Sequence, residues 1–245
     1  MKREVEQQFI DKCNSICDKG WIPSKRKGNT GIGYTFETEI GVKENNSTTA
    51  DYGHIEIKTC RLPARSMVSL FTYSPKFPEN AMSILHSNFG LIDKRGYQTL
   101  YSTIKGHRYN TYKKTYRFKV SVNRESSIVT IRSTTMSGTD TGIEVGYTFS
   151  DLEKQMKKLE TLALVGAKVK KTEEGEQFQY QNPKLMKFKG IDTFLELLED
   201  GTIAIDVRVG VYKSGSKEGQ THDHGTAFRI KPKDICKLFE DSSFE

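Results

Sequence analysis

The sequence predicts a mixed protein of helices and strands, of the α/β or α+β class. Apolar residues recur at helical spacing near the start, while stretches of alternating apolar and polar residues, typical of strands, follow later. Polar, glycine-containing segments separate them, and no internal repeat or low-complexity tract is visible. With 245 residues, of which 35% are hydrophobic and 10% aromatic, the chain can bury one large core or two lobes.

The first predicted helix spans roughly residues 3–19 and ends at Gly20, because glycine is a common residue just past a helix C-terminus. Cys13 and Cys17 lie on its apolar stripe, so we interpret them as buried thiols. The four cysteines do not form the paired Cys-x-x-Cys clusters of a zinc site. A basic, glycine-rich loop at 24–33 then leads into a short helix around residues 35–40.

Strands come next. Residues 55–58 and 67–73 are rich in β-forming residues, and we expect them to be neighbours in a small mixed sheet. Alternation at 115–122 and 127–132 predicts an antiparallel pair with one polar, basic face.

The second half of the chain is also predicted to contain both helices and strands. Ser150-Asp-Leu-Glu153 has the form of a capping box and predicts a helix through about residue 159. The other elements predicted here are strands at 162–169, 203–211 and 221–230, a turn at 173–176 and a helix at 191–198. The last two strands should form a ribbon with a polar tip, narrow enough to enter a DNA major groove. Asp206 and Arg208 share one face of the first of them.

The charge of the chain favours a polyanionic partner. Lysine and arginine number 38 against 31 aspartate and glutamate, a formal net charge of +7. Nucleic acid is attracted to such a surface, although soluble proteins that bind none can carry a similar excess. The N-terminus lacks the apolar run of a signal peptide, and nowhere do eighteen apolar residues follow one another, so we expect a cytoplasmic protein with no membrane partner.

The segment from Asp51 to Lys58 has the residue types of a metal-dependent nuclease. Glu56 and Lys58 point to the same side of a strand while Ile55 and Ile57 turn into the core, and Asp51 can converge on them from just before it. Two carboxylates suit Mg²⁺, and a neighbouring ammonium can steady the attacking water or the developing charge. The spacing is loose enough to arise by chance, so a solvated strand edge is the alternative.

Two further segments carry candidate binding residues. Lys25, Arg26 and Lys27, beside glycines at a helix N-terminus, can grip a phosphate; the alternative is a flexible surface loop. His222-Asp-His224 can be read as a metal site, a general-base histidine or a polar loop that reads base edges. The metal site is the weakest of the three, because no further cysteine or histidine stands nearby.

Several blocks of the chain together resemble the MvaI/BcnI restriction endonucleases. In order, these blocks are Lys25-Arg-Lys-Gly-Asn-Thr-Gly-Ile-Gly33, Thr35-Phe-Glu37, Ile55-Glu-Ile-Lys-Thr59, Ser69-Leu-Phe-Thr72 with Ser74-Pro75, and Thr221-His-Asp-His-Gly-Thr-Ala-Phe-Arg-Ile230. The resemblance implies a MutH-like PD-(D/E)xK fold, with a mixed β-sheet core flanked by helices and two lobes that form a DNA-binding cleft. We expect residues 1–150 to be mainly the catalytic lobe and 151–245 mainly the recognition lobe, with interleaving allowed.

The resemblance also implies an activity. Members are type II enzymes that use Mg²⁺, with Mn²⁺ as a substitute, and cut double-stranded DNA at short CC-N-GG-type sites as monomers that nick each strand in turn. A cognate DNA methyltransferase is then expected in the same cell, though not as a stable partner. Two rivals stay open: a MutH-like mismatch-repair nicking endonuclease, and a DNA-binding module without catalysis.

The resemblance assigns roles to individual residues. Asp51 and Glu56 would be catalytic metal ligands, Lys58 the catalytic lysine, Glu37 an auxiliary acid, and the Ile57 carbonyl a further metal ligand. The implied DNA-binding residues are Lys25, Arg26, Lys27, Asn29, Thr30, Gly31, Asp206, Arg208, His222, Asp223, His224 and Arg229. Two positions depart from the pattern: Ala50 replaces a proline common in the superfamily, and Cys60 stands where a relative has histidine.

Overall fold

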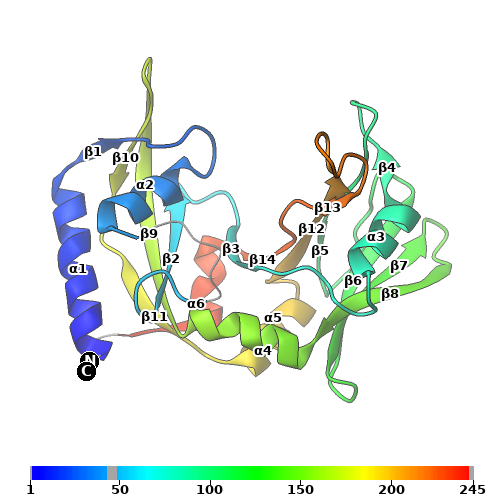
Figure 1. Ribbon diagram of the computed structural model, residues 1–245. Helices are drawn as coiled ribbons and strands as arrows, with labels where there is room; N and C mark the ends of the chain where they lie inside the picture. Colours follow the sequence, from blue (N-terminus) through cyan, green and yellow to red (C-terminus); the bar gives the residue numbers. More distant parts are fainter. Residues whose placement is uncertain (1, 43–48, 243–245) are drawn as a thin grey trace. The chain divides into compact units, whose positions relative to one another are not determined.

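The computed structural model describes residues 2–42 and 49–242, and the chain divides into two compact units (Figure 1). The first unit is built from Met1–Val68, Met156–Gly190 and Lys231–Glu245, and the second from Ser69–Gln155 and Ile191–Ile230. Their segments alternate along the chain, so the compact units are not separated by one boundary near residue 150. The mixed α+β class predicted from the sequence is confirmed.

The first unit contains a sheet whose strands run in the order β1-β10-β9-β11-β15, with β2 pairing β9 in parallel. Its strands are β1 Trp21–Pro23, β2 Ile55–Arg61, β9 Thr161–Thr172, β10 Gly175–Tyr180, β11 Lys184–Phe188 and β15 Phe239–Asp241. Its helices are α1 Lys2–Asp18, α2 Gly31–Ile40, the 3-10 turns η1 Lys157–Leu159 and η2 Pro232–Asp234, and α6 Ile235–Leu238.

Helices α1 and α2 pack on this sheet through one apolar core. Phe9 and Cys13 of α1 meet Phe36 of α2 and Ile55 and Ile57 of β2, and all five side chains are buried. The predicted first helix, its buried Cys13 and the inward Ile55 and Ile57 are therefore confirmed. Because Ile55 and Ile57 face the helices, the alternate residues of β2 turn to the other side of the sheet.

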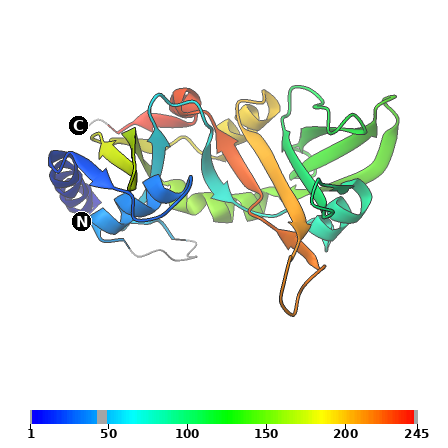
Figure 2. The ribbon, with the colours of Figure 1, turned by 90° about the horizontal axis from the view of Figure 1, so that it is seen from above.

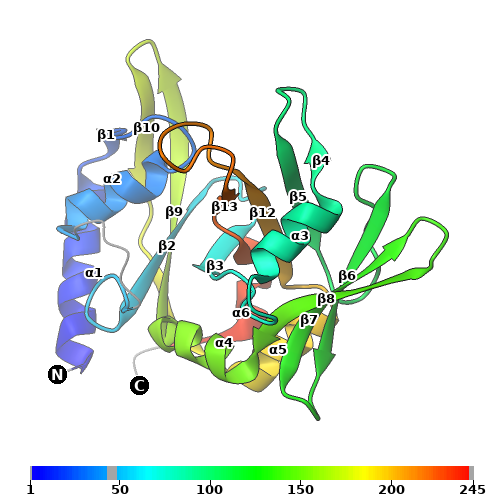
Figure 3. The same ribbon diagram turned by 45° about the vertical axis from the view of Figure 1, so that its right-hand side comes forward.

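The second unit contains two sheets, one in the order β3-β14-β12-β5-β4 with β13 pairing β12, the other in the order β6-β7-β8. Its strands are β3 Val68–Thr72, β4 Leu91–Ile92, β5 Gln98–Ile104, β6 Tyr116–Asn123, β7 Ile128–Thr135, β8 Asp140–Thr148, β12 Ala204–Val211, β13 Thr221–Asp223 and β14 Ala227–Ile230. Its helices are α3 Ala81–Phe89, α4 Phe149–Met156 and α5 Ile191–Glu199. Figure 3 shows α3, which packs against β5, β12 and β13.

Two local predictions are wrong. Strands β2 and β3 are not neighbours, because β2 pairs β9 whereas β3 pairs β14 of the other unit's sheet; the period of a strand defines its faces but not its partner. Helix α4 begins at Phe149 instead of at the Ser150 capping box, because the Thr148 hydroxyl accepts the Asp151 amide hydrogen bond at 3.1 Å.

The predicted antiparallel pairs are confirmed, but the single strand predicted at 221–230 is divided into β13 and β14, because the Asp223 carboxylate holds a turn between them. Strands β6 and β7 align from Tyr116↔Thr135 to Asn123↔Ile128. Strand β12 continues through a polar loop into β13, with Val211 opposite Thr221, and this loop projects from its sheet in Figure 2. Along the described residues, no helix is long and apolar enough to cross a membrane.

Candidate active site and base-reading ribbon

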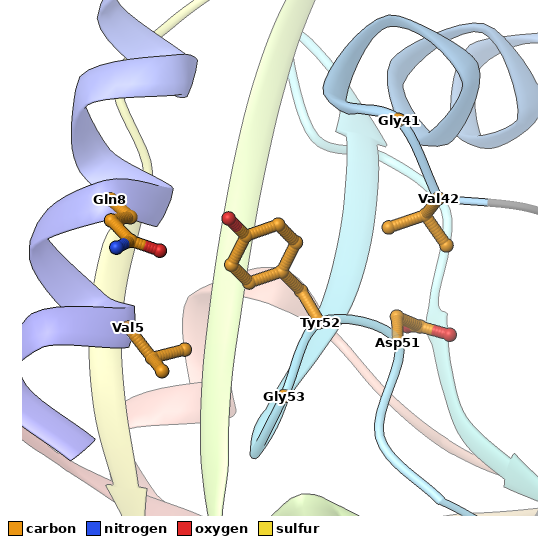
Figure 4. Close-up of a pocket in the computed structure, with 7 residues that line it drawn as sticks. All are labelled: Val5, Gln8, Gly41, Val42, Asp51, Tyr52 and Gly53. Atoms are coloured by element: carbon orange, nitrogen blue, oxygen red, sulfur yellow. The ribbon is translucent and has the colours of Figure 1, made fainter. Parts of the chain in front are cut away.

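The candidate nuclease motif, Asp51 with Glu56 and Lys58, lies at the start of β2. Asp51 lies in the turn before this strand, and its Oδ2 accepts a hydrogen bond from the Ile57 amide at 2.8 Å, so the carboxylate is held against β2. The side chain of Tyr52 points toward α1 while that of Asp51 points the other way (Figure 4). A hollow of about 390 Å³, lined among others by Val5, Asp51 and Tyr52, lies beside this turn.

Glu56 is the most enclosed member of the motif, with 1% of its surface exposed. Its Oε1 accepts Lys58 Nζ at 2.5 Å and lies 3.0 Å from Lys158 Nζ, a residue of η1 that the sequence did not single out. Its Oε2 is buried and, within the described part of the chain, has no hydrogen-bond partner. A buried carboxylate oxygen without a partner is costly unless a ligand fills the position.

The electrostatics of the two carboxylates favour a cation between them. Burial raises the pKa of Asp51, and the negative charge of Glu56 raises it further, against the lowering effects of the Ile57 amide and of Lys58 and Lys158. Two acids that disfavour each other's charge are stabilised by a bound divalent ion.

The donor set fits a hard divalent cation better than a zinc site. Among the described residues, no group of three or more histidine, cysteine or acidic side chains gathers as a metal site. The side chains supply Asp51 and the open Oε2 of Glu56, which leaves other positions for backbone, water or phosphate oxygen, as Mg²⁺ commonly requires. The Ile57 carbonyl as a ligand stays a prediction.

Glu37 lies on α2, which packs against β2, and is half-buried. Its helix thus belongs to the layer that supports the motif strand. Its role as an auxiliary acid stays a prediction.

The glycine-rich loop is anchored to the helix that follows it. The Lys25 amide donates to Thr35 Oγ1 at 2.9 Å, its ammonium pairs with Glu39 at 2.6 Å, and the Arg26 guanidinium lies 3.8 Å from the centre of the Tyr34 ring. A Cβ at position 31 would come within 2.4 Å of the Arg26 carbonyl oxygen, so this close approach requires glycine.

These contacts hold the loop backbone in one shape and leave other groups at the surface. The exposed members of the loop are Lys25, Lys27, Gly28, Asn29 and Thr30. Helix α2 starts at Gly31, earlier than predicted, so the loop ends at a helix N-terminus, where backbone amides favour anions.

In the second unit, Asp206 joins two arginines. Its Oδ2 accepts Arg208 Nε at 2.8 Å and lies 3.2 Å from Arg229 Nε, which is an ion pair without hydrogen-bond geometry, while Oδ1 accepts the Thr103 hydroxyl at 2.8 Å. The carboxylate is 9% exposed, against 46% for Arg208 and 26% for Arg229. The contacts of Asp206 therefore fit a residue that orients both guanidiniums.

The histidines of the ribbon lie among aromatic rings, with His222 stacked on Tyr212 and His224 edge-to-face with His222. The centre of the His222 ring lies 4.0 Å from that of Tyr212 and 4.5 Å from that of His224, and the His224 ring lies 6.0 Å from the ring of Tyr101, edge to face. Burial, and then the nearby positive charge of His222 and Lys213, lowers the pKa of His224. Neutral imidazoles can donate and accept hydrogen bonds toward base edges.

Asp223 has a different environment from its neighbours. Its Oδ1 accepts the amides of Gly225 and Thr226 and the Thr226 hydroxyl, and its Oδ2 accepts the Ser74 hydroxyl. The carboxylate thus holds the turn after β13, and its contact with bases stays a prediction.

The sequence reasoning missed four residues of these two sites: Lys158, Tyr101, Gly210 and Tyr212. Lys158 lies in the last turn of a predicted helix and belongs to no motif of its own. Gly210 is needed because a Cβ there would lie 3.0 Å from His224 Nε2, and alternation along β12 could have pointed to it. The tyrosines carry no local signal, since tyrosine is common in strands.

A model of the MvaI/BcnI restriction endonuclease family matches residues 10–239, which is nearly the whole chain. The chain belongs to this family. The predicted family, and with it the prediction of a type II site-specific nuclease, is confirmed.

Solved structures agree with the MvaI/BcnI assignment. The chain is 33% identical to the restriction endonuclease MvaI, whose structure was solved in complex with its cognate DNA substrate. The alignment covers 98% of this chain and 98% of the MvaI chain, with a TM-score of 0.89. MvaI in the absence of DNA aligns with a TM-score of 0.65 at 33% identity, over 97% of this chain and 96% of that one. No curated protein matches the chain.

Proposed function

We propose that this endonuclease hydrolyses phosphodiester bonds of double-stranded DNA at a short CC-N-GG-type site, with Mg²⁺ as its cofactor and Mn²⁺ as a substitute. The observation that carries the proposal is the buried Oε2 of Glu56 beside Asp51, which has no hydrogen-bond partner among the described residues, with a lysine on the other oxygen. Duplex DNA as the substrate is supported by the relative of 33% identity, MvaI, which was solved with its cognate DNA.

The residues of the first unit would have distinct parts in the reaction. Asp51 and Glu56 would hold the divalent ion, with the Ile57 carbonyl as a further ligand, and Glu37 would assist as an auxiliary acid. A bound Mg²⁺ supplies positive charge at the phosphate and acidifies a coordinated water. The Lys58 ammonium, 2.5 Å from Glu56 Oε1, would orient the attacking water or the phosphate.

DNA binding would use both units, with the first as the catalytic lobe and the second as the recognition lobe. Arg208 and Arg229, oriented by Asp206, would read guanine edges, since the planar guanidinium matches the acceptors of guanine. His222, His224 and Asp223 complete the proposed reading surface. The loop residues Lys25, Arg26, Lys27, Asn29, Thr30 and Gly31 would hold the DNA backbone near the cut.

The proposal also covers where the enzyme acts and in which oligomeric state. The enzyme would act in the cytoplasm as a monomer that nicks each strand in turn, and a methyltransferase in the same cell would protect the host sites.

The test is cleavage of unmethylated plasmid DNA by the purified protein in Mg²⁺. Discrete fragments whose ends map to one short CC-N-GG-type site are the expected result. Asp51→Ala should abolish cleavage and keep specific binding, whereas the control Asp18→Ala, an exposed acid at the end of α1, should cut normally.

Other outcomes would contradict the proposal. Full activity of Asp51→Ala would mean that the site is misassigned, and no cutting in any divalent ion would favour the binding module. Single-strand nicks at GATC-type sites that need a protein activator would favour the mismatch-repair alternative.

A further inference from the structure

Lys158 lies at the candidate active site but is not part of any motif in the sequence. It belongs to η1, which immediately precedes β9, the parallel partner of β2. Its Nζ lies 3.0 Å from Glu56 Oε1, and its side chain is 19% exposed, almost the same as the 20% of Lys58. Two ammonium groups therefore share one carboxylate oxygen.

The flanking residues explain how Lys158 reaches this position. Met156 and Leu159 are buried and anchor η1 in the core, whereas Lys157 is exposed. Glu160, the next acid along the chain, pairs with Lys2 and not with Lys158. The 3-10 turn thus directs one lysine of the Lys157-Lys158 pair onto the motif and the other to the surface.

The number of charges exceeds what a structural ion pair needs. One lysine suffices to neutralise a buried Glu56, and Lys58 already does this at 2.5 Å. With Asp51 the cluster holds two carboxylates and two ammonium groups, so its formal charges balance in the metal-free protein. A divalent ion held by the carboxylates would give the site a net charge of +2.

This net positive charge of the metal-bound site matches the negative charge that develops on the phosphoryl group during hydrolysis. The attacking water gives a proton to solvent, its oxygen bonds to phosphorus, the bond from phosphorus to the leaving oxygen breaks, and the leaving oxygen takes up a proton from solvent. At mid-reaction the phosphoryl group with its attacking oxygen therefore carries two negative charges. Groups placed where charge develops lower the barrier most. We propose that Lys158 is a second active-site lysine, which leaves Glu56 when the metal binds and contacts the scissile phosphate.

This inference rests on the proposed function, and Lys157 supplies a matched control. Lys158→Met and Lys157→Met remove the same charge from adjacent positions. We would measure single-turnover cleavage, in Mg²⁺, of a duplex oligonucleotide carrying the site mapped on the plasmid. We would also measure the affinity for the same duplex with EDTA and with Ca²⁺, a hard cation with similar ligands that would occupy the site.

Lys158→Met should lower the single-turnover rate by about 100-fold, the order found when a single charge-stabilising group is removed. In the parent, Ca²⁺ should raise the affinity for the duplex above that in EDTA, because the Lys158 ammonium leaves Glu56 and contacts the phosphate. Lys158→Met should lose most of this increase, because it has no ammonium at this position. Lys157→Met should keep that gain and cut within about threefold of the parent, since it loses only a distant phosphate attraction. Lys158→Arg should restore part of both quantities.

Two results would overturn the inference. The first is a Lys158→Met protein that keeps the rate and the Ca²⁺ gain of the Lys157 control. The second is a Lys158→Met protein that cuts faster than the parent and needs less Mg²⁺ to do so. This would show that Lys158 only competes with the metal for Glu56. If Lys158→Met does not fold, Lys158→Gln takes its place. A parent enzyme that cuts, with an inactive Asp51→Ala and a normal Lys158 variant, would refute this inference alone; a parent that cuts nothing would refute the proposed function.

Discussion

The environment of Asp206 makes a strong prediction for the variant Asp206→Asn. The carboxylate is 9% exposed and faces two guanidiniums and the Thr103 hydroxyl. Asparagine keeps the shape and can still accept the Thr103 hydrogen bond, but it removes the negative charge that Asp206 places against Arg208 and Arg229. The substitution thus isolates the electrostatic part of the interaction.

Breaking a fully buried ion pair costs about 3–5 kcal/mol, and the partial exposure of the arginines reduces this to about 2–3 kcal/mol. For a chain of this length, such a loss corresponds to a melting temperature lower by about 4–12 °C. The exposed pair Arg132–Asp140, at 3.2 Å with both side chains about half exposed, is the control. Asp140→Asn should cost less than about 1 kcal/mol.

Thermal and urea unfolding followed by circular dichroism would measure both variants. Asp206→Asn should also lower the preference for the CC-N-GG-type duplex over a scrambled duplex by about tenfold or more, because mobile guanidiniums discriminate guanine less well. Equal unfolding midpoints for the two variants, or an unchanged preference in Asp206→Asn, would refute the orienting role of Asp206.

Three further predictions use other parts of the chain. In the native protein a disulfide reagent should modify exposed Cys236 first and leave Cys13 intact until urea is added, because burial raises the pKa of Cys13 to about 12; early Cys13 labelling, mapped by mass spectrometry, would contradict this. Gly31→Ala should destabilise the protein by about 1–3 kcal/mol in urea unfolding, whereas Gly33→Ala, whose Cβ would find ordinary contacts, should not. Partial desolvation of the exposed His224 lowers its pKa below the ordinary 6.5, so its contribution to stability is present above pH 6.5 and is lost as pH falls toward its folded pKa. Because solvent screens an exposed ring, His224→Gln should lose only slightly less melting temperature than the parent on acidification, and a larger loss would count against it.

Periodicity predicted much of the local structure correctly. Alternation placed Ile55 and Ile57 of β2 in the core, and the turn-rich loop after β12 indicated the hairpin with β13. These features depend on neighbours within a few residues, so they can be read from the chain directly. The start of α4 was misplaced because two hydroxyl residues, Thr148 and Ser150, compete as caps within one turn.

Partners distant in the chain could not be read in this way. Strand β2 pairs β9, with Glu56 opposite Leu162, although the segment Ser69–Gln155 of the second unit intervenes between them in the sequence. Alternation predicted that Glu56 faces away from the helices, but its near-complete burial depends on its surroundings in space, among them the nearby Lys158 ammonium. Nothing in the spacing of residues 51–58 contains that information.

The sequence by itself determined that Glu56 and Lys58 share one face of a strand with Asp51 just before it, that a basic glycine loop precedes them, and that the order of these blocks is that of the MvaI/BcnI enzymes. Tertiary structure alone decided that Lys158 shares an oxygen of Glu56 and that Asp206 joins two arginines. The reason is physical: ion pairing depends on the distance and burial of charges in space, whereas the sequence specifies only their separation along the chain.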